Sequence, residues 1–223
     1  MRRAAFEIYA YAAPAILAPL TFWLWWHRYD GALGPTLTAW LVPVLYAYIV
    51  PAVGTNVLRV WEFDTRVRIG RFRPQHGFVF GSATAALAWL CHGEPATDWT
   101  GVARTSAWLG VVLGSVNVIY DVKLLESGVL RVYNQPWAEG RGSAEIVLDY
   151  APWFFGAFGA VYGAALGTAE LLATQGRLTG AAVPGFVALA LVVAIAVPVA
   201  GYWLQSLRRH GHSGCRPVAR IEP

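Results

Sequence analysis

Residues 183–206 decide the class of this protein: they read VPGFVALALVVAIAVPVAGYWLQS and contain no charged side chain. An apolar run of 18 or more residues is long enough to cross a bilayer as a helix. The whole chain agrees, because 57% of its 223 residues are hydrophobic and only 13% are charged, whereas soluble domains carry about 25% charged residues. We therefore predict an integral membrane protein and exclude a soluble enzyme, a disulfide scaffold and a disordered chain.

Outward from this stretch, apolar runs between charged breaks predict six membrane-spanning helices. Their bounds are about 4–26, 36–60, 74–91, 105–125, 148–172 and 183–206, and the third is the shortest. At 1.5 Å per residue, each can cross a hydrocarbon core of roughly 30 Å. The predicted fold class is all-α: one polytopic helical domain over 1–223 with a tail at 207–223. An alternating run at 129–133 predicts a short strand, followed by a turn at 134–136.

The basic residues predict the orientation of these spans. If the N-terminus is cytoplasmic, the 17 Lys and Arg residues all fall on inner segments except Arg28, Arg104 and Arg177. An excess of Lys and Arg on cytoplasmic segments is typical of membrane proteins. We therefore predict that both termini are cytoplasmic and that the protein lies in the inner (plasma) membrane. The net charge of +4 comes from these arginines in segments that flank the membrane. The expected partner is therefore the lipid bilayer and not a nucleic acid.

Glycines in two of the spans predict close helix packing. Gly159, Gly163 and Gly167 repeat every four residues in the fifth span, and Gly110 and Gly114 do so in the fourth. Small residues at this spacing let helices approach closely in lipid. The pattern does not say whether the partner helix belongs to the same chain, to a second copy in a homo-oligomer, or to another protein of a membrane complex.

Carboxylates near the inner boundary are the predicted catalytic residues. Glu62 follows the second span, Asp121 lies inside the fourth and Asp149 opens the fifth. Ionisable groups at membrane depth are costly, so they are hypotheses about function. A partly solvated site of low dielectric raises the pKa of a carboxyl group, which can then keep its proton near neutral pH. We therefore predict acid–base chemistry at the cytoplasmic end of the bundle.

Polar and aromatic side chains at the same level are predicted to line a substrate site. Amide and imidazole groups can orient a carboxyl group, and aromatic rings stabilise a cation through their faces. Asn117 and Asp121 share a helix face, because they are four residues apart. The predicted substrate-binding residues are Asn56, Trp61, His76, Asn117, Tyr120, Tyr150 and Trp153, with Phe63, Phe154 and Phe155 as further aromatic neighbours.

Structural roles for the same carboxylates remain as alternatives. Asp121 could form a buried pair with Arg59 that orients two helices. Asp149 could be a helix N-cap, which the helix dipole favours. Glu62 and Asp64 lie close in sequence to five arginines and could form salt bridges within the loop.

The C-terminal tail contains residue types that bind metals, namely His210, His212 and Cys215. Their Gly- and Ser-containing surroundings favour a flexible tail over a metal site. Phosphate-binding loops, zinc-protease motifs and matched haem-ligand pairs are absent from the sequence. We therefore expect neither a metal nor a cofactor.

The stretch Asn56…Trp61-Glu62-Phe63 resembles the Asn-x-x-Trp-Glu-Phe stretch of membrane-bound terpene cyclases of meroterpenoid and indole-diterpene pathways. Here the Asn is two residues further from the Trp. The resemblance implies a metal-independent reaction in which a carboxylic acid, Glu62, protonates an epoxide or alkene and the polyprenyl chain closes through carbocations. That family has seven spans and a second acid in the last one. The last span here has no carboxylate, so Asp121 or Asp149 would take that part.

The predicted function is an integral-membrane enzyme, a cyclase or isomerase, acting on a lipophilic isoprenoid-like substrate. The alternative from another class is a non-catalytic lipid- or pigment-binding subunit or an assembly factor of a membrane complex. A small transporter is less favoured, because the ionisable groups cluster at one end of the bundle. Glu170, in the outer third of the fifth span, has no obvious partner in the sequence.

Overall fold

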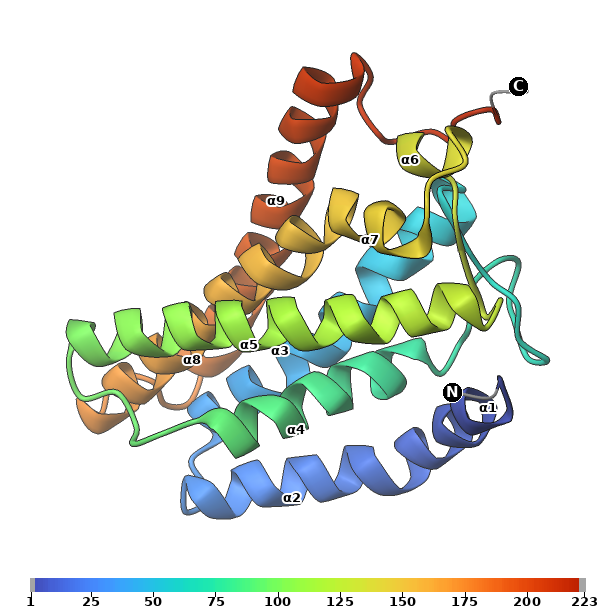
Figure 1. Ribbon diagram of the computed structural model, residues 1–223. Coiled ribbons are helices and arrows are strands. Elements are labelled where there is room, and N and C mark those ends of the chain that lie inside the picture. Colours follow the sequence, from blue (N-terminus) through green and yellow to red (C-terminus); the bar gives the residue numbers. More distant parts are fainter. Residues whose placement is uncertain (1–2, 221–223) are drawn as a thin grey trace.

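The computed structural model describes residues 3–220 and is 73% helical (Figure 1). Five of its helices are long and apolar enough to cross a membrane. They are Arg3–Arg28 (α1 Arg3–Ala12, η1 Ala13–Leu17, α2 Ala18–Arg28), Leu33–Val57 (α3 Leu33–Ala52, η2 Val53–Val57), α5 (Trp99–Glu126), Ser143–Thr174 (α7 Ser143–Ala151, η4 Pro152–Ala157, α8 Phe158–Thr174) and α9 (Ala182–His210). Arg2, and the last three residues of the predicted tail, lie outside the described residues.

The third predicted span, 74–91, forms a shorter helix than the other five. It consists of η3 (Gly77–Gly81) and α4 (Ser82–Cys91) and falls below the 18 residues that the five long helices exceed. Gly77–Cys91 is about 22 Å long at 1.5 Å per residue, which is less than the hydrocarbon thickness of roughly 30 Å. This helix packs between α2 and α3, and a Cβ on Gly81 would collide with the backbone of Val44.

The fourth predicted span begins earlier than its hydrophobicity indicates. α5 begins at Trp99 rather than at 105, because Asp98 caps it: the Asp98 carboxylate accepts a hydrogen bond of 2.7 Å from the backbone N–H of Gly101. A capping side chain satisfies one of the free N–H groups of the first turn. The outer connection therefore spans 92–98 and not 92–104.

Wider π-helical turns interrupt three of the long helices next to prolines. Pro14 lies within η1, Pro51 lies just before η2, and Pro152 opens η4. Proline has no N–H for the helix ladder and its ring clashes with the preceding turn, so the helix widens locally. Two of these turns, η2 and η4, lie beside the cavities described below.

Two short strands cross the same end of the bundle. β1 (Trp61–Phe63) pairs antiparallel with β2 (Leu130–Val132), with Glu62 opposite Arg131. The strand predicted near 129–133 is confirmed. The predicted end of the second span at 60 is wrong, because the helix stops at Val57 and the chain continues into β1. The predicted turn at 134–136 is the start of a one-turn helix, α6 (Gln135–Ala138), which Asn134 caps.

We call the end of the bundle that holds β1, β2 and α6 the strand end. The beginning of α1 and the tail after α9 also lie at this end, on the right of Figure 1. The connections between α2 and α3, between α4 and α5, and between α8 and α9 lie at the opposite end.

The glycine face of α8 packs against α5 of the same chain. A Cβ on Gly159 would lie 2.6 Å from the carbonyl oxygen of Leu109, and one on Gly163 would lie 2.5 Å from that of Thr105. A Cβ on Gly167 would lie 3.0 Å from Val102 Cα. Of all the element pairs described, α5 and α8 make the most extensive contact. In this structure, the helix that packs against these three glycines therefore belongs to the same chain.

We predict that Gly163→Ala destabilises the protein, whereas Gly156→Ala does not. The new methyl group at 163 would overlap the Thr105 carbonyl, and forcing extra volume into a packed interface costs about 1–3 kcal/mol. A Cβ at Gly156 meets no atom within 4 Å. Thermal unfolding in detergent measures the difference, and equal unfolding temperatures for the two variants would show that the α5–α8 contact is looser than the structure has it.

Candidate functional site

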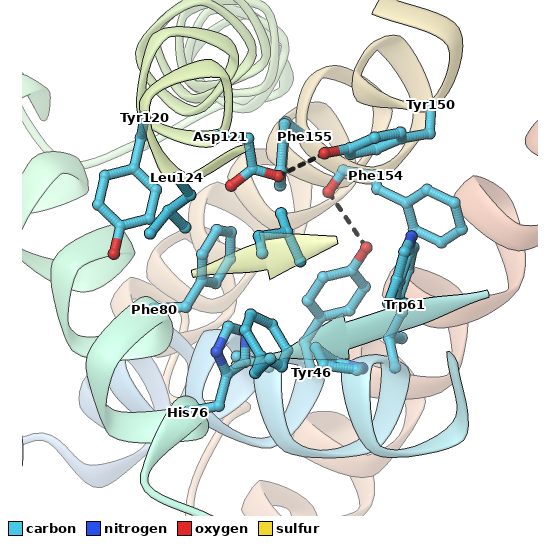
Figure 2. A pocket seen from close by; sticks show the side chains of 15 residues that line it. Tyr46, Trp61, His76, Phe80, Tyr120, Asp121, Leu124, Tyr150, Phe154 and Phe155 are labelled. Carbon is cyan, nitrogen blue, oxygen red and sulfur yellow. Dashed lines mark hydrogen bonds between the residues drawn. The ribbon is translucent and has the colours of Figure 1, made fainter. Parts of the chain in front are cut away.

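An aromatic cavity of about 60 Å³ lies beneath the two strands (Figure 2). We call it the acid cavity. It is smaller than the roughly 300–1,000 Å³ of common small-molecule sites, but like them it is mainly apolar with a few polar groups. Its lining comes from α3, β1, η3, α5, β2, α7 and η4: Tyr46, Ala47, Val50, Pro51, Trp61, Phe63, His76, Phe80, Tyr120, Asp121, Leu124, Leu130, Tyr150, Phe154 and Phe155.

Asp121 is the single carboxylate of this lining. Its residue is 8% exposed, and the Tyr150 hydroxyl donates a hydrogen bond of 2.7 Å to its Oδ2. Figure 2 shows these two groups pointing toward one another from α5 and α7. The other oxygen, Oδ1, accepts no hydrogen bond from any described residue. Asp121 therefore presents one held and one free oxygen.

The sequence of α5 explains why Asp121 is buried. Leu113, Asn117, Asp121 and Leu124 are spaced three or four residues apart and form one buried face. Asn117 does not reach the carboxylate: its amide donates to the carbonyl of Leu113 at 2.9 Å, and it lines a different cleft. The alternative pairing of Asp121 with Arg59 is wrong, because Arg59 is exposed.

Strand geometry separates Glu62 from its neighbours. Successive side chains of a strand point to opposite faces, and Trp61 and Phe63 line the acid cavity whereas Glu62 does not. Glu62 accepts a hydrogen bond of 2.8 Å from the Tyr133 hydroxyl and lies 3.6 Å from Arg68. Burial, followed by the hydrogen bond to Glu62, raises the pKa of Tyr133, so this hydroxyl remains a donor at neutral pH.

The loop salt bridge predicted for Glu62 is confirmed, whereas the one predicted for Asp64 is wrong, because Asp64 pairs with arginines outside the loop. Besides the Glu62–Arg68 pair, Asp64 lies 3.3 Å from Arg3 and 3.5 Å from Arg131. Asp64 thereby ties the beginning of α1 to β2. Because these groups are partly exposed, the pairs contribute modestly to stability.

A buried arginine, Arg73, supports one wall of the acid cavity. It is 1% exposed and donates to His76 Nδ1 at 2.9 Å, while its guanidinium lies 5.1 Å from the Phe63 ring. A guanidinium can only donate, so His76 accepts at Nδ1 and carries its proton on Nε2. Burial lowers the pKa of Arg73, and the nearby Tyr120 and Asp121 act in the opposite direction. In the sequence, Arg73 is one basic residue among several on the predicted inner side, and nothing there indicates its burial.

Asp149 is a structural junction outside the acid cavity. It lies in the last turn of α7, so the N-cap alternative is wrong. Its carboxylate accepts hydrogen bonds from Asn134 at 3.0 Å and Tyr202 at 3.3 Å, and it pairs with His210 at 2.9 Å. Asp149 thus joins α7 to the cap of α6 and to the end of α9.

The described part of the tail is packed, contrary to the flexible tail that its composition predicts. After His210, the tail folds back across the strand end. His212 lies 3.2 Å from the side-chain oxygen of Gln135, and the backbone N–H of Val218 donates to the carbonyl of Tyr133 at 3.0 Å. Within residues 3–220, no three His, Cys, Asp or Glu side chains are grouped so that they could hold a metal ion.

Of the predicted site residues, the structure brings Trp61, His76, Tyr120, Asp121 and Tyr150 together in the acid cavity. Two others serve local structure. Asn56 binds the 69–71 backbone, donating to the Ile69 carbonyl at 3.1 Å and accepting from the Arg71 N–H at 2.8 Å. The Trp153 indole donates to Gln205 at 2.8 Å and its ring covers Gly201.

Two aromatic residues of the cavity, Tyr46 and Phe80, are missing from the predicted site. The Tyr46 hydroxyl donates to the Phe154 carbonyl at 3.1 Å, and the rings of Phe80 and Phe155 stack 5.7 Å apart. Both lie inside strongly apolar runs, where an aromatic side chain gives no separate signal in the sequence. The lone polar atom of Tyr46 at membrane depth was the one available hint.

At the opposite end of the bundle, Glu170 has the partners that the sequence did not reveal. It is 2% exposed, accepts 2.5 Å and 2.8 Å hydrogen bonds from the Tyr29 hydroxyl and the Ala96 N–H, and lies 2.8 Å from His92 Nε2. A buried carboxylate held by three groups joins α2, α8 and the 92–98 connection. Its role is structural.

Comparisons of the chain with models of protein families, with curated proteins and with solved structures found no match. The resemblance to membrane-bound terpene cyclases therefore stays a prediction, based on the four residues that suggested it.

We predict that Asp149→Ala loosens the tail. The substitution removes the acceptor of Tyr202 and His210 and one of the two acceptors of the Asn134 amide, and a buried polar group left unpaired costs about 1–3 kcal/mol. Backbone hydrogen exchange of residues 211–218 should accelerate. Glu145→Ala, on an exposed position of the same helix, is the matched control. Equal exchange in the two variants would show that Asp149 does not hold the tail.

Proposed function

We propose that this protein is an integral-membrane enzyme that protonates a lipophilic isoprenoid-like substrate, with Asp121 as the acid. The observation that supports it is the free Oδ1 of Asp121 in a cavity otherwise walled by apolar and aromatic side chains. A carboxyl group with one oxygen held and the other free is suited to deliver a proton to a bound alkene or epoxide.

The proposed reaction is an isomerisation. Protonated Asp121 transfers its proton to an epoxide oxygen or a terminal alkene carbon of the substrate, which becomes a carbocation. A neighbouring double bond attacks the cation and closes a ring, and the final cation loses a proton to the Asp121 carboxylate. The substrate gains and loses one proton, so its mass is unchanged and no redox partner is required.

The surroundings of Asp121 suit both charged species of this cycle, the Asp121 carboxylate and the substrate carbocation. The Tyr150 hydrogen bond stabilises the carboxylate that remains after proton transfer. The rings of Trp61, Phe63 and Phe155 present faces or edges to the space where the cation would form, and aromatic faces attract cations. The apolar lining also disfavours water, which would trap the cation as an alcohol.

Geometry favours Asp121 over Glu62, the acid implied by the resemblance. Glu62 points away from the acid cavity and is engaged by Tyr133 and Arg68. The type of chemistry that the resemblance implies is retained in our proposal, but its acid lies on α5 instead of β1.

We further propose six membrane crossings in the inner membrane, with the strand end in the cytoplasm. The start of α1 and the tail lie at the same end of the bundle (Figure 1), as an even number of crossings requires. The short helix Gly77–Cys91 would be the sixth crossing. The basic loops at the strand end support the orientation.

The acid assignment predicts opposite outcomes for two carboxylate variants. Asp121→Asn should lower turnover at least about 100-fold, the usual contribution of a general acid, whereas Glu62→Gln should leave turnover largely unchanged. The purified protein is incubated with farnesol, geranylgeraniol and their terminal epoxides, and isomers of unchanged mass are measured by gas chromatography–mass spectrometry.

Each other result of this experiment has a definite meaning. Loss of turnover only in Glu62→Gln would return the acid to Glu62. Turnover that survives both substitutions in folded protein would refute carboxylate catalysis. If no isomer forms but a stoichiometric lipid or pigment co-purifies with the wild-type protein, the cavity belongs to a non-catalytic binding subunit.

The proposed orientation predicts the labelling of the two cysteines. Cys91 ends α4 at the end opposite the strand end, and Cys215 lies in the tail. In intact cells, a membrane-impermeant maleimide should react with the Cys215→Ser variant, which retains Cys91, and not with Cys91→Ser until the membrane is permeabilised. The reverse pattern would invert the topology, and labelling of both variants from outside would exclude the three crossings proposed between the two cysteines.

A further inference from the structure

A second cavity, of about 250 Å³, adjoins the acid cavity. We call it the portal cavity. It lies between the strand-end halves of α3 and α9 and beneath the tail. Its lining is Ile49, Val50, Val53, Gly54, Leu58, Val60, Trp61, Val132, Tyr133, Asn134, Tyr150, Phe154, Ile195, Val199, Tyr202, His212, Gly214, Cys215, Arg216 and Val218.

The two cavities share a wall made of Val50, Trp61, Tyr150 and Phe154. The Trp61 ring stands edge-on to Phe154, with centroids 5.4 Å apart, and lies 6.2 Å from the Tyr150 ring. Gly54 leaves room for this ring, because a Cβ there would collide with it. Trp61 is therefore the largest side chain of the partition between the cavities.

The mouth of the portal cavity faces the lipid side of the bundle. Ile49, Val53 and Val199 line it and are also exposed on the outer faces of their helices. These faces belong to helices that are long and apolar enough to cross a membrane. An apolar chain could thus pass between α3 and α9 from the bilayer without crossing water.

Most polar residues of the portal cavity lie in or beside the tail, namely Tyr133, Asn134, His212 and Arg216. The hydroxyls of Tyr150 and Tyr202, which also line it, are bonded to Asp121 and Asp149. The tail is fastened by the Val218–Tyr133 backbone hydrogen bond and by the His210–Asp149 pair. The cavity is therefore apolar toward the lipid and closed toward the cytoplasmic side. This arrangement suits a hydrocarbon chain rather than a polar metabolite.

Because the two cavities adjoin across this shared wall, we infer that the portal cavity binds the unreacting hydrocarbon chain of the same molecule whose reactive end lies beside Asp121. Trp61 then marks the boundary between the reacting and the unreacting part and is a determinant of chain length. The inference rests on the proposed function for the reacting end. The binding of an elongated isoprenoid across both cavities can be tested without turnover.

The test compares two valines of α9, of which only one lines the portal cavity. Val199 lines the portal cavity and Val197 does not, although they are 40% and 39% exposed. Val199→Trp fills the mouth of the cavity, and Val197→Trp adds the same side chain elsewhere on the lipid-facing surface. Equilibrium binding of radiolabelled geraniol and geranylgeraniol to the full-length protein in nanodiscs is measured for both variants.

We expect Val199→Trp to weaken geranylgeraniol binding at least about tenfold, since losing the burial of two methylene groups already corresponds to that factor. Under the inference, geraniol occupies the acid cavity alone, so it should bind as in the wild type, and Val197→Trp should bind both alcohols normally. Equal effects on the two alcohols, no effect of Val199→Trp, or no binding of geranylgeraniol by the wild type would each overturn the inference.

Failure of the inference and failure of the proposed function give different results. If Val199→Trp weakens only geranylgeraniol binding but no isomer ever forms, the two-cavity site stands and the enzyme proposal fails. If isomers form in an Asp121-dependent manner while Val199→Trp has no effect on binding or on chain-length preference, the enzyme proposal stands and the portal assignment fails.

Discussion

The close contact of α5 with α8 is the constraint on which the rest of the structure depends. Glycines on α8 let the two helices approach until a side chain at Gly159 or Gly163 would strike the α5 backbone. Because α7, η4 and α8 form one continuous helical segment, this contact also fixes α7 beside the strand-end half of α5. The Tyr150 hydroxyl then meets the Asp121 carboxylate at 2.7 Å.

The three buried carboxylates of the bundle differ in how completely they are satisfied. Asp149 and Glu170 each have three polar partners and join helices to neighbouring segments. Asp121 has one, and its second oxygen is left for the cavity. Full pairing suits a structural role for Asp149 and Glu170, whereas the oxygen left for the cavity supports the proposal that Asp121 acts on a bound molecule.

The short sheet at the strand end organises the space around Asp121. β1 comes from the segment after the second span and β2 from the segment after α5, and their pairing closes the acid cavity. The alternation of β1 directs Trp61 and Phe63 inward and leaves Glu62 outside. The folded tail then covers the neighbouring portal cavity. The short sheet and the tail, neither of which is a long helix, thus each cover one cavity.

Hydrophobicity alone determined that this chain is a helical membrane protein, because each long span satisfies its own backbone hydrogen bonds and must be apolar along its length. The sequence also predicted that Asp121 shares a helix face with Asn117 and lies near aromatic residues, because helix periodicity is a local property. Three features were decided only by tertiary structure: the partner of the glycine face, the outward direction of Glu62 and the partners of Glu170. Each depends on contacts between segments far apart in the chain, such as the Trp61–Val132 register, which no local pattern encodes.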